Sequence, residues 1–503
     1  MIRFTEENDA LIARSRNETI RIEGWGNNAL RVRTTLLKKL PRDAHALTEN
    51  VAHSAKVTID EGSETAEIVN GKIKATVNGV GIICFYKDNE LILQEYYSYY
   101  YGSVRKEAIC YKIRSREYKG LASDDFKITV RFESDPKEKL FGMGQYQMPI
   151  LDLKGSVLPL EQRNSQVSVP FVVSNKGYGM LWNNPSTGEA AFGTNITKWI
   201  SDESDMVDYW ITADDTPAQI VTNYTECVGR APVMSKDYLG LWQCKLRYRT
   251  PDEVLEVARK YKELGIRLDV IVIDFFHWPH QGDWRFDEKY WSRDAVKAMT
   301  DELHAMGTKV MVSVWPSVDK RSENYYEMEQ KALISTTDVG SVQTYDYEGD
   351  CGTVDFFNPE AQEFVWGKCK QNYRDWGIDL FWLDNSEPDS TKYDFENYRY
   401  YTGRGSKVGC EYPKKYVEAF YNGQEAEGDH EAVNLCRSAW VGSQKYRTLV
   451  WTGDVQSNFE SFKDQVIAGQ NMGLAGIPWW TTDIGGFMTD NWDDPDFKEL
   501  LIR

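Results

Sequence analysis

Residues 250–278, TPDEVLEVARKYKELGIRLDVIVIDFFHW, decide the fold of the second half of the chain. Thr250 can cap a helix that has Pro251 at its first position, apolar residues then recur on one face, and Gly265 ends the helix. A strand follows at 266–274 and stops at Asp274. A helix, a glycine and an apolar strand in this order predict one βα unit of a parallel sheet.

The same order recurs further along the chain. Asp294 can start a second helix, which ends at Gly307 before a strand at 308–315. Asn358 can start a third, which is expected to reach Trp376 before the next strand. Seven strands are expected in all, at 238–245, 266–274, 308–315, 378–384, 432–438, 448–454 and 476–483. This number predicts a (β/α)8-type TIM barrel that is truncated before its eighth strand.

The first half of the chain has a different pattern of apolar residues. Short alternating or apolar segments, separated by Gly, Asn and Asp turns, predict an antiparallel β-sandwich without any helix of three turns. These segments are 18–24, 55–60, 72–86, 126–134 and 169–182. We therefore expect two domains, an N-terminal β-sandwich at 1–230 and a catalytic barrel at 231–503.

Composition narrows the classes of function. The 503 residues carry a net charge of −18 and no long Lys/Arg run, which disfavours nucleic acid and anionic membrane surfaces as partners. The eight cysteines form no CxxC pair and are expected to be reduced thiols. The N-terminus lacks the features of a signal peptide, and no apolar stretch is long enough to span a bilayer. A cytoplasmic protein is expected, and whether it forms a homo-oligomer stays open.

Four of the expected strands end in an aspartate: Asp274, Asp384, Asp454 and Asp483. The C-terminal ends of parallel barrel strands form the active-site face. One such aspartate is an ordinary helix cap, but four of them predict an acidic pocket. Tryptophans interleaved with these positions would give the pocket aromatic walls: Trp278, Trp315, Trp382, Trp451, Trp479 and Trp480.

Paired carboxylates in an aromatic pocket suit the cleavage of a glycosidic bond. Carboxylate clusters also bind Mg²⁺ or Ca²⁺, but the loop motif of a Ca²⁺ site is absent, and His277 and His280 are the only close pair of histidines. No metal ion or other cofactor is expected. The chain lacks GxxxxGK[ST], a GxGxxG between strand and helix, and GxSxG, so phosphate-binding loops and a serine-hydrolase elbow are not supported.

The motifs of the second half together resemble glycoside hydrolase family 31, which contains retaining α-glucosidases and α-xylosidases. The resemblance runs from about residue 140 to the end. It is strongest from 236 to 487, where seven runs match family patterns in the expected order: 270–278, 282–291, 311–319, 381–389, 434–446, 451–460 and 477–487. Family members continue with an eighth strand and C-terminal β domains, so activity of these 503 residues alone is an open question.

The resemblance implies roles for individual residues. Asp384 is similar to the family's nucleophile and Asp454 to its acid/base. Asp274 is similar to an aspartate that grips sugar hydroxyls, and Arg437 to a hydroxyl-binding arginine. Glu387 would support the nucleophile loop, and Asp389 is left as a loop or cap residue. The remaining substrate-binding residues are expected to be Phe275, Phe276, Trp278, Trp315, Trp382, Trp451 and Asp483.

The nature of the sugar depends on Phe275 and Phe276. In the family this stretch lies near carbon 5 of the bound sugar, where aromatic bulk crowds the hydroxymethyl arm of glucose and leaves room for xylose. An α-xylosidase acting on an oligosaccharide or α-glycoside is therefore favoured over an α-glucosidase, unless these rings turn into the barrel core. The alternative functions are α-galactosidase or transglycosylase activity, a carbohydrate-binding protein that has lost turnover, and a metal-dependent sugar enzyme.

Overall fold

The computed structural model describes residues 2–49, 51–60, 62, 64–96, 114–121, 124–342, 344–387, 395–489 and 492–503. The chain divides into two compact units. The sandwich unit comprises 1–161, 168–230 and 459–478, and the barrel unit comprises 162–167, 231–458 and 479–503. Two stretches, 162–167 and 459–478, thus belong to a different unit from the chain that flanks them.

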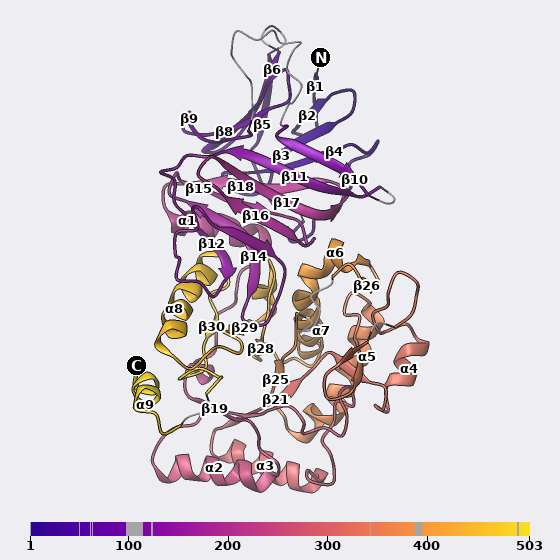
Figure 1. Cartoon of the computed structure of the whole chain (residues 1–503), viewed down its shortest axis with the longest axis vertical. Coiled ribbons are helices and arrows are strands. Elements are labelled where there is room, and N and C mark those ends of the chain that lie inside the picture. Colours follow the sequence, from indigo (N-terminus) through magenta and orange to yellow (C-terminus); the bar gives the residue numbers. More distant parts are fainter. Residues whose placement is uncertain are drawn as a thin grey trace. The chain divides into compact units, whose positions relative to one another are not determined.

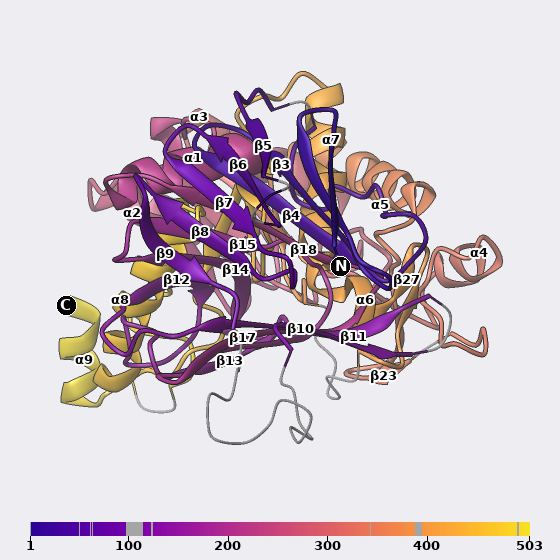
Figure 2. The same ribbon diagram turned by 90° about the horizontal axis from the view of Figure 1, so that it is seen from above.

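The sandwich unit is built from antiparallel sheets, as the sequence predicts. Its largest sheet has the order β1 (Arg3–Glu7), β2 (Ala10–Arg14), β3 (Thr19–Gly24), β4 (Ala29–Thr35), β18 (Val207–Ala213), β15 (Tyr178–Trp182), β14 (Val167–Ser174), β12 (Leu140–Gln145). A second has the order β10 (Arg116–Gly120), β11 (Phe126–Glu133), β17 (Ile196–Ser204), β16 (Gly188–Phe192), β13 (Val157–Leu160). A third runs in chain order through β5 (Lys56–Asp60), β6 (Thr65–Asn70), β7 (Ile73–Val77), β8 (Ile83–Lys87) and β9 (Glu90–Gln94), and forms one layer in Figure 2.

The period-two pattern of the sequence explains why these strands pack into a core. In β7, Ile73, Ala75 and Val77 are fully buried, whereas the residues between them are partly exposed. Successive side chains of a strand point to opposite faces, so one face of the sheet carries the apolar set. Trp182 and Trp199 stack in this core with their ring centroids 6.0 Å apart.

A helix in the sandwich unit corrects one expectation. Helix α1 (Pro217–Val228) has 12 residues, so the prediction that no helix of three turns occurs before residue 230 was wrong. Thr216 caps it by accepting a hydrogen bond from Gln219 N at 3.3 Å. Its buried face includes Tyr224, which stacks on Phe171 with ring centroids 3.7 Å apart. The sandwich unit also contains α8 (Phe459–Leu474), which packs against β12.

The barrel unit contains a sheet of seven parallel strands (Figure 1). Their order is β19 (Trp242–Lys245), β20 (Val270–Ile273), β21 (Lys309–Val314), β25 (Leu380–Leu383), β28 (Asn434–Cys436), β29 (Thr448–Trp451), β30 (Trp480–Thr481). Each strand lies within one of the seven segments that the sequence predicts. Within the described residues no eighth strand joins β30 to β19. A sheet of βα units with seven parallel strands confirms the predicted fold class.

The sequence also explains the layers of the barrel unit. In β20, Ile271 and Ile273 belong to the core between the sheet and its helices, whereas Val270 and Val272 belong to the core inside the sheet. A strand with both faces covered is apolar throughout, as this one is. The helices are α2 (Pro251–Glu263), α3 (Arg293–Ala305), α4 (Tyr325–Gln330), α5 (Pro359–Asn372), α6 (Gly405–Val408), α7 (Tyr412–Ala426) and α9 (Pro495–Ile502); α2 and α3 lie side by side in Figure 1. The short strands are β22 (Ser317–Asp319), β23 (Tyr345–Asp346), β24 (Asp350–Thr353), β26 (Arg399–Tyr400) and β27 (Gly403–Arg404).

Two helix boundaries differ from the prediction. Ser292, not Asp294, is the N-cap of α3, because its hydroxyl accepts from Ala295 N, and Asp294 instead lies in the first turn. There its charge faces the positive end of the helix dipole. The third predicted helix, α5, ends at Asn372 and is followed by a separate 3-10 turn, Arg374–Trp376. Thr250 does cap α2, as predicted.

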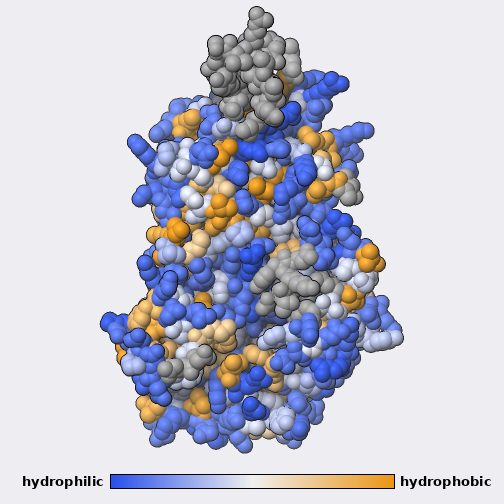
Figure 3. Space-filling model, in the orientation of Figure 1, coloured by the Kyte–Doolittle hydropathy of each residue, from blue (hydrophilic) through white to orange (hydrophobic). Residues whose placement is uncertain are grey.

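The surface is mainly polar, and 27% of the residues are charged. On the face shown in Figure 3, hydrophilic residues predominate and hydrophobic residues form small, scattered groups. No helix within the described residues combines the length and the apolar character that crossing a bilayer requires.

Candidate active site

A cavity of about 300 Å³ in the barrel unit collects the aspartates at the strand ends. Its lining consists of Asp274, Phe275, Trp315, Tyr347, Trp382, Asp384, Asn385, Arg437, Trp451, Asp454, Asp483, Phe487 and Met488. All four predicted aspartates are present. Of the eleven predicted site residues, Phe276 and Trp278 are the two outside the lining.

The carboxylate of Asp384 is buried at the end of β25 and held by three donors. Trp315 Nε1 donates to Oδ2 at 2.9 Å, and Asn385 N donates to Oδ1 at 2.8 Å. Asn385 has a φ of 56°, a left-handed conformation that asparagine tolerates better than most residues. Arg437 Nη1 lies 3.3 Å from Oδ1. Burial raises the pKa of Asp384, and the charge of Arg437 opposes that rise.

Arg437 connects the two carboxylates that the resemblance implies are catalytic. Its Nη1 lies 3.3 Å from Asp384 Oδ1 and 3.9 Å from Asp454 Oδ2. The two oxygens therefore cannot be farther apart than these two distances combined. This limit admits the separation of roughly 5–5.5 Å typical of retaining glycosidases and excludes the upper part of the roughly 6.5–9.5 Å range of inverting ones.

Glu387 supports the site from behind rather than facing the cavity. It is fully buried, does not line the cavity, and pairs with Nε and Nη2 of Arg437 at 2.9–3.1 Å. Arg437 Nη2 also donates to Asn385 Oδ1 at 2.8 Å, which ties the turn after Asp384 to the arginine. Asp389 lies outside the described residues.

Asp454 follows β29 and Gly453, whose φ is +73°. Its side chain is 29% exposed, compared with 7% for Asp384. Asn164 holds it at two points: Asn164 Nδ2 donates to Asp454 Oδ2 at 2.5 Å, and Asp454 N donates to Asn164 Oδ1 at 3.1 Å. No motif in the sequence marks Asn164 as part of this site.

The other two aspartates have few donors; Asp274 is buried and Asp483 is partly buried. Asp274 accepts from Phe275 N at 2.7 Å and from the thiol of Cys244 at 3.9 Å. Burial raises the pKa of Asp274 to about 8, and the nearby charge of Asp384 adds to the rise. Burial also raises the pKa of Asp483 to about 7. Such perturbed carboxyls in a cavity are typical of functional sites.

Aromatic rings form the walls of the cavity. The ring of Phe275 packs against Trp315 with centroids 5.0 Å apart, and Trp382 meets Trp451 edge-on at 5.3 Å. Phe276 and Trp278 also pack against Trp315, at 6.0 and 5.9 Å, and thus support the wall from outside the cavity. Of the other predicted tryptophans, Trp479 and Trp480 do not line it.

Several residues of the site are not predicted by any motif in the sequence. Tyr347, Phe487 and Met488 line the cavity with exposures of 45%, 37% and 45%. Arg247 places its guanidinium 4.9 Å from the ring centroid of Phe275. Tyr347 is in a hairpin loop and Phe487 follows two glycines, so no periodic pattern marks either of them.

His277 has a structural role. A carbonyl can only accept, so Nδ1 of His277 donates to Asp274 O at 2.9 Å, and Nε2 accepts from the hydroxyl of Tyr373 at 2.9 Å. Burial lowers the pKa of His277 to about 4. Both nitrogens are thus occupied by protein. No group of three or more His, Cys, Asp or Glu side chains in the described part of the chain is arranged to hold a metal ion.

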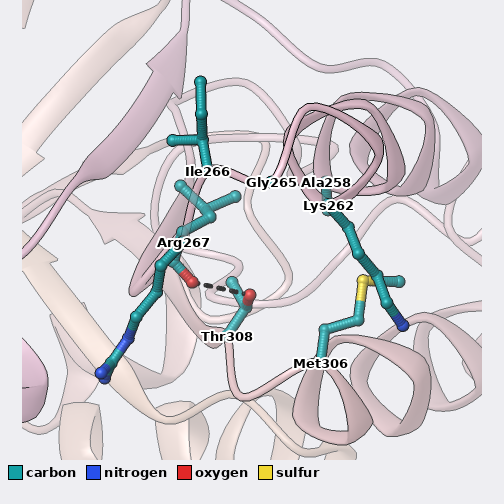
Figure 4. A pocket seen from close by; sticks show the side chains of 8 residues that line it. Ala258, Lys262, Gly265, Ile266, Arg267, Met306 and Thr308 are labelled. Atoms are coloured by element: carbon teal, nitrogen blue, oxygen red, sulfur yellow. Dashed lines mark hydrogen bonds between the residues drawn. The ribbon is translucent and has the colours of Figure 1, made fainter.

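A second pocket, of about 280 Å³, lies at the C-terminal ends of α2 and α3 (Figure 4). Lys262 and Arg267 flank it, and Thr308 donates a hydrogen bond to Leu268 O at 2.8 Å at its base. Its eight lining residues include no carboxylate, histidine or cysteine, so it lacks the paired carboxylates of the first cavity.

Comparisons with known proteins agree with this geometry. Residues 231–503 match the glycosyl hydrolases family 31 TIM-barrel domain, and 19–190 match the family's N-terminal galactose mutarotase-like domain. The chain is 47% identical to "Uncharacterized family 31 glucosidase ORF2" of Pseudescherichia vulneris, over 100% of this chain and 96% of that protein. It is 33% identical to an α-xylosidase of Saccharolobus solfataricus, over 75% of this chain and 52% of that protein, so it spans about half of that relative.

A solved structure of a family 31 enzyme is also similar to this chain. The chain superimposes on a family 31 α-xylosidase from a soil metagenome, complexed with xylose, with a TM-score of 0.95 and 46% identity. The match covers 99% of this chain and 75% of that one.

Proposed function

Because the chain belongs to glycosyl hydrolase family 31, we propose that it is a retaining glycosidase that removes a terminal α-linked xylose from an oligosaccharide or glycoside. The observation that carries the proposal is that one nitrogen of Arg437 lies within 4 Å of the carboxylates of both Asp384 and Asp454, inside a cavity with aromatic walls.

In the first step, Asp384 attacks the anomeric carbon of the sugar. The bond from that carbon to the leaving oxygen breaks, and Asp454 gives its proton to that oxygen. The product is a sugar ester of Asp384. Arg437, Asn385 N–H and Trp315 Nε1–H all favour the ionised form of Asp384, which is the form that can attack.

In the second step, Asp454 acts as the base. It takes a proton from water, the water oxygen attacks the anomeric carbon, and the ester bond to Asp384 breaks. The sugar leaves with its original anomeric configuration, and Asp454 again carries a proton. The greater exposure of Asp454 suits this role, because both water and the leaving group must reach it.

The wall beside Asp274 favours xylose over glucose. Phe275 lines the cavity, and its ring is held by Trp315 at 5.0 Å, by Phe276 at 4.7 Å and by the guanidinium of Arg247. A ring packed on three sides cannot turn away to admit a hydroxymethyl arm. Steric exclusion of this kind discriminates more strongly than one lost apolar contact, which is worth only about 1–3 kcal/mol.

A panel of 4-nitrophenyl α-glycosides tests the proposal. We expect the wild-type chain to hydrolyse the α-xyloside faster than the α-glucoside or α-galactoside. Asp384→Asn should lower kcat by a factor on the order of 10⁴ or more, as loss of a nucleophile does elsewhere. A preference for the α-glucoside would show that glucose, not xylose, is the preferred sugar. Normal turnover by Asp384→Asn would show that Asp384 is not the nucleophile.

The same panel separates the other functions. A carbohydrate-binding protein would bind xylose in calorimetry but turn over none of the glycosides. A metal-dependent enzyme would lose activity when a chelator is added, whereas we expect no change because no step of the proposed mechanism uses a metal.

A further inference from the structure

Residues 162–167 lie in the first half of the sequence but belong to the barrel unit. Gln162, which is fully buried, anchors them: its Nε2 donates to Cys410 O at 3.1 Å, and its Oε1 accepts from Ser438 Oγ at 3.1 Å. Arg163 and Gln166 exchange two backbone hydrogen bonds, of 3.2 and 2.8 Å. Asn164 and Ser165 therefore form the two-residue tip of a hairpin.

The tip lies directly against the turn that carries Asp454. A Cβ added to Gly453 would lie 2.7 Å from Asn164 Oδ1 and 2.8 Å from Ser165 N. Only glycine allows this approach, and its φ of +73° also suits glycine. The close contact between the tip at 164–165 and the turn before Asp454 therefore depends on the glycine at 453.

The hydrogen bonds settle the orientation of the Asn164 amide. Asp454 N–H can only donate, so the amide atom 3.1 Å away is the oxygen, Oδ1. Nδ2 then faces the carboxylate and donates to Oδ2 at 2.5 Å. Arg437 Nη1 approaches the same oxygen at 3.9 Å. Within the described residues no protein donor contacts Oδ1 of Asp454.

We propose that Asn164 is a positioning residue for the acid/base: its amide reserves Oδ2 of Asp454 as a hydrogen-bond acceptor and so leaves Oδ1 to carry the proton to the leaving oxygen. The inference rests on the proposed function. An oxygen that faces two donors is a poor place for a proton, whereas the oxygen without a donor is free to hold one and present it to substrate. The second bond, to Asp454 N–H, fixes the backbone and keeps the carboxyl in this orientation.

The test compares substrates that differ in their need for a proton. Phenyl α-xyloside has a poor leaving group, whereas α-xylosyl fluoride departs without general-acid help. General acid–base catalysis contributes about 10²–10⁴-fold, so partial loss of its alignment in Asn164→Ala should lower kcat/KM for the phenyl xyloside by about 10–100-fold. The fluoride should change by less than about threefold.

Two further variants make the result specific. Asn164→Asp keeps the size of the side chain and the acceptor for Asp454 N–H but removes the donor to Oδ2, so it should show the same selective loss even if Asn164→Ala misfolds. Asn195→Ala is the matched control: Asn195 is an exposed asparagine in the β16–β17 turn of the sandwich unit, and it should behave like wild type.

Equal losses on both substrates, or no loss on either, would overturn the positioning role. A loss that follows the size of the aglycone rather than its acidity would also overturn it, because it would make Asn164 a substrate contact. If wild type hydrolyses neither substrate, the proposed function itself fails, and that outcome is distinct from the other two because it is seen before any variant is measured.

Discussion

Glu387 and Arg437 form an ion pair that is buried on both sides. Arg437 Nε lies 3.0 and 3.1 Å from the two oxygens of Glu387, and Nη2 lies 2.9 Å from Oε2. The remaining nitrogen, Nη1, faces Asp384 and Asp454. Glu387 thus fixes the guanidinium in the plane in which Nη1 faces the carboxylates of Asp384 and Asp454, and it balances the charge of Arg437.

Glu387→Gln should impair the enzyme in two ways. The substitution keeps the shape of the side chain but leaves the charge of Arg437 unbalanced by Glu387. Removing one partner of a buried pair costs about 3–5 kcal/mol, so a clear fall in Tm is expected. The excess positive charge also favours ionised carboxylates, so kcat on phenyl α-xyloside should fall more than KM changes. Thermal unfolding and steady-state kinetics measure both effects.

Glu302→Gln is the matched control for this variant. Glu302 makes a similar two-point pair with Arg259, with both contacts at 2.7 Å, but on the surface of the barrel unit. Exposed pairs contribute little to stability, so this variant should leave Tm and kcat unchanged. Equal behaviour of the two variants would mean that burial of the Glu387–Arg437 pair has no consequence.

Asp454→Ala should separate the two halves of the reaction. Loss of a general acid should lower kcat/KM for phenyl α-xyloside by about 10²–10⁴-fold, whereas α-xylosyl fluoride should still form the sugar ester of Asp384. Azide needs no base to attack, so adding it should restore turnover of the fluoride and release α-xylosyl azide. NMR of the product identifies its anomer. A β-xylosyl azide would mean that the nucleophile and the acid/base are assigned the wrong way round.

The sequence predicted the elements that depend on local patterns. The strands ending at Asp274 and Asp384 are apolar runs bounded by glycine and aspartate, and such a continuous run predicts a strand that is covered on both faces. Their convergence follows from the parallel sheet, because all strand ends meet on one face. Helix α1 was not predicted although Thr216 and Pro217 mark its start, because its β-branched residues, such as Ile220, Val221 and Thr222, have a low helix propensity.

The sequence could not predict contacts that depend on distant segments. Asn164 is 290 residues away from Asp454, and an Asn-Ser pair between polar residues indicates only a turn. Phe275 and Phe276 are adjacent and identical in type, yet only Phe275 lines the cavity. The difference comes from the backbone, which is left-handed at Phe276 with a φ of 62°, and no propensity rule predicts that for phenylalanine.

Phe275→Ala should relax the preference for xylose. Removing the ring opens space beside Asp274 for a hydroxymethyl arm, so kcat/KM for the α-glucoside should rise relative to the α-xyloside. A change of about 10–100-fold in this ratio corresponds to the roughly 1–3 kcal/mol that one group in a pocket is worth. Phe364→Ala, in α5 and outside the cavity, should leave the ratio unchanged. An unchanged ratio in Phe275→Ala would show that the selectivity lies elsewhere.

Asp274→Asn should stabilise the protein, and increasingly so as the pH rises. The pKa of Asp274 is raised from an ordinary value near 3.8 to about 8, first of all by burial. A group whose folded pKa is raised adds stability below its unfolded pKa, and that contribution is lost as the pH rises through the folded value. Wild type should therefore lose stability relative to Asp274→Asn between about pH 4 and pH 8, and the gap in Tm should be larger at pH 9 than at pH 5.

A surface aspartate provides the control for this effect. Asp493, whose side chain is fully exposed, should give an Asn variant with the same Tm as wild type at both pH values. Asp274→Asn should also lower activity on α-xyloside, most of all above about pH 8, where the wild-type side chain is ionised and grips sugar hydroxyls more strongly than an amide does. If the variant has a higher Tm than wild type at high pH but hydrolyses α-xyloside more slowly, the buried charge of Asp274 lowers stability and assists the reaction. A gap in Tm that is independent of pH would contradict the raised pKa of Asp274.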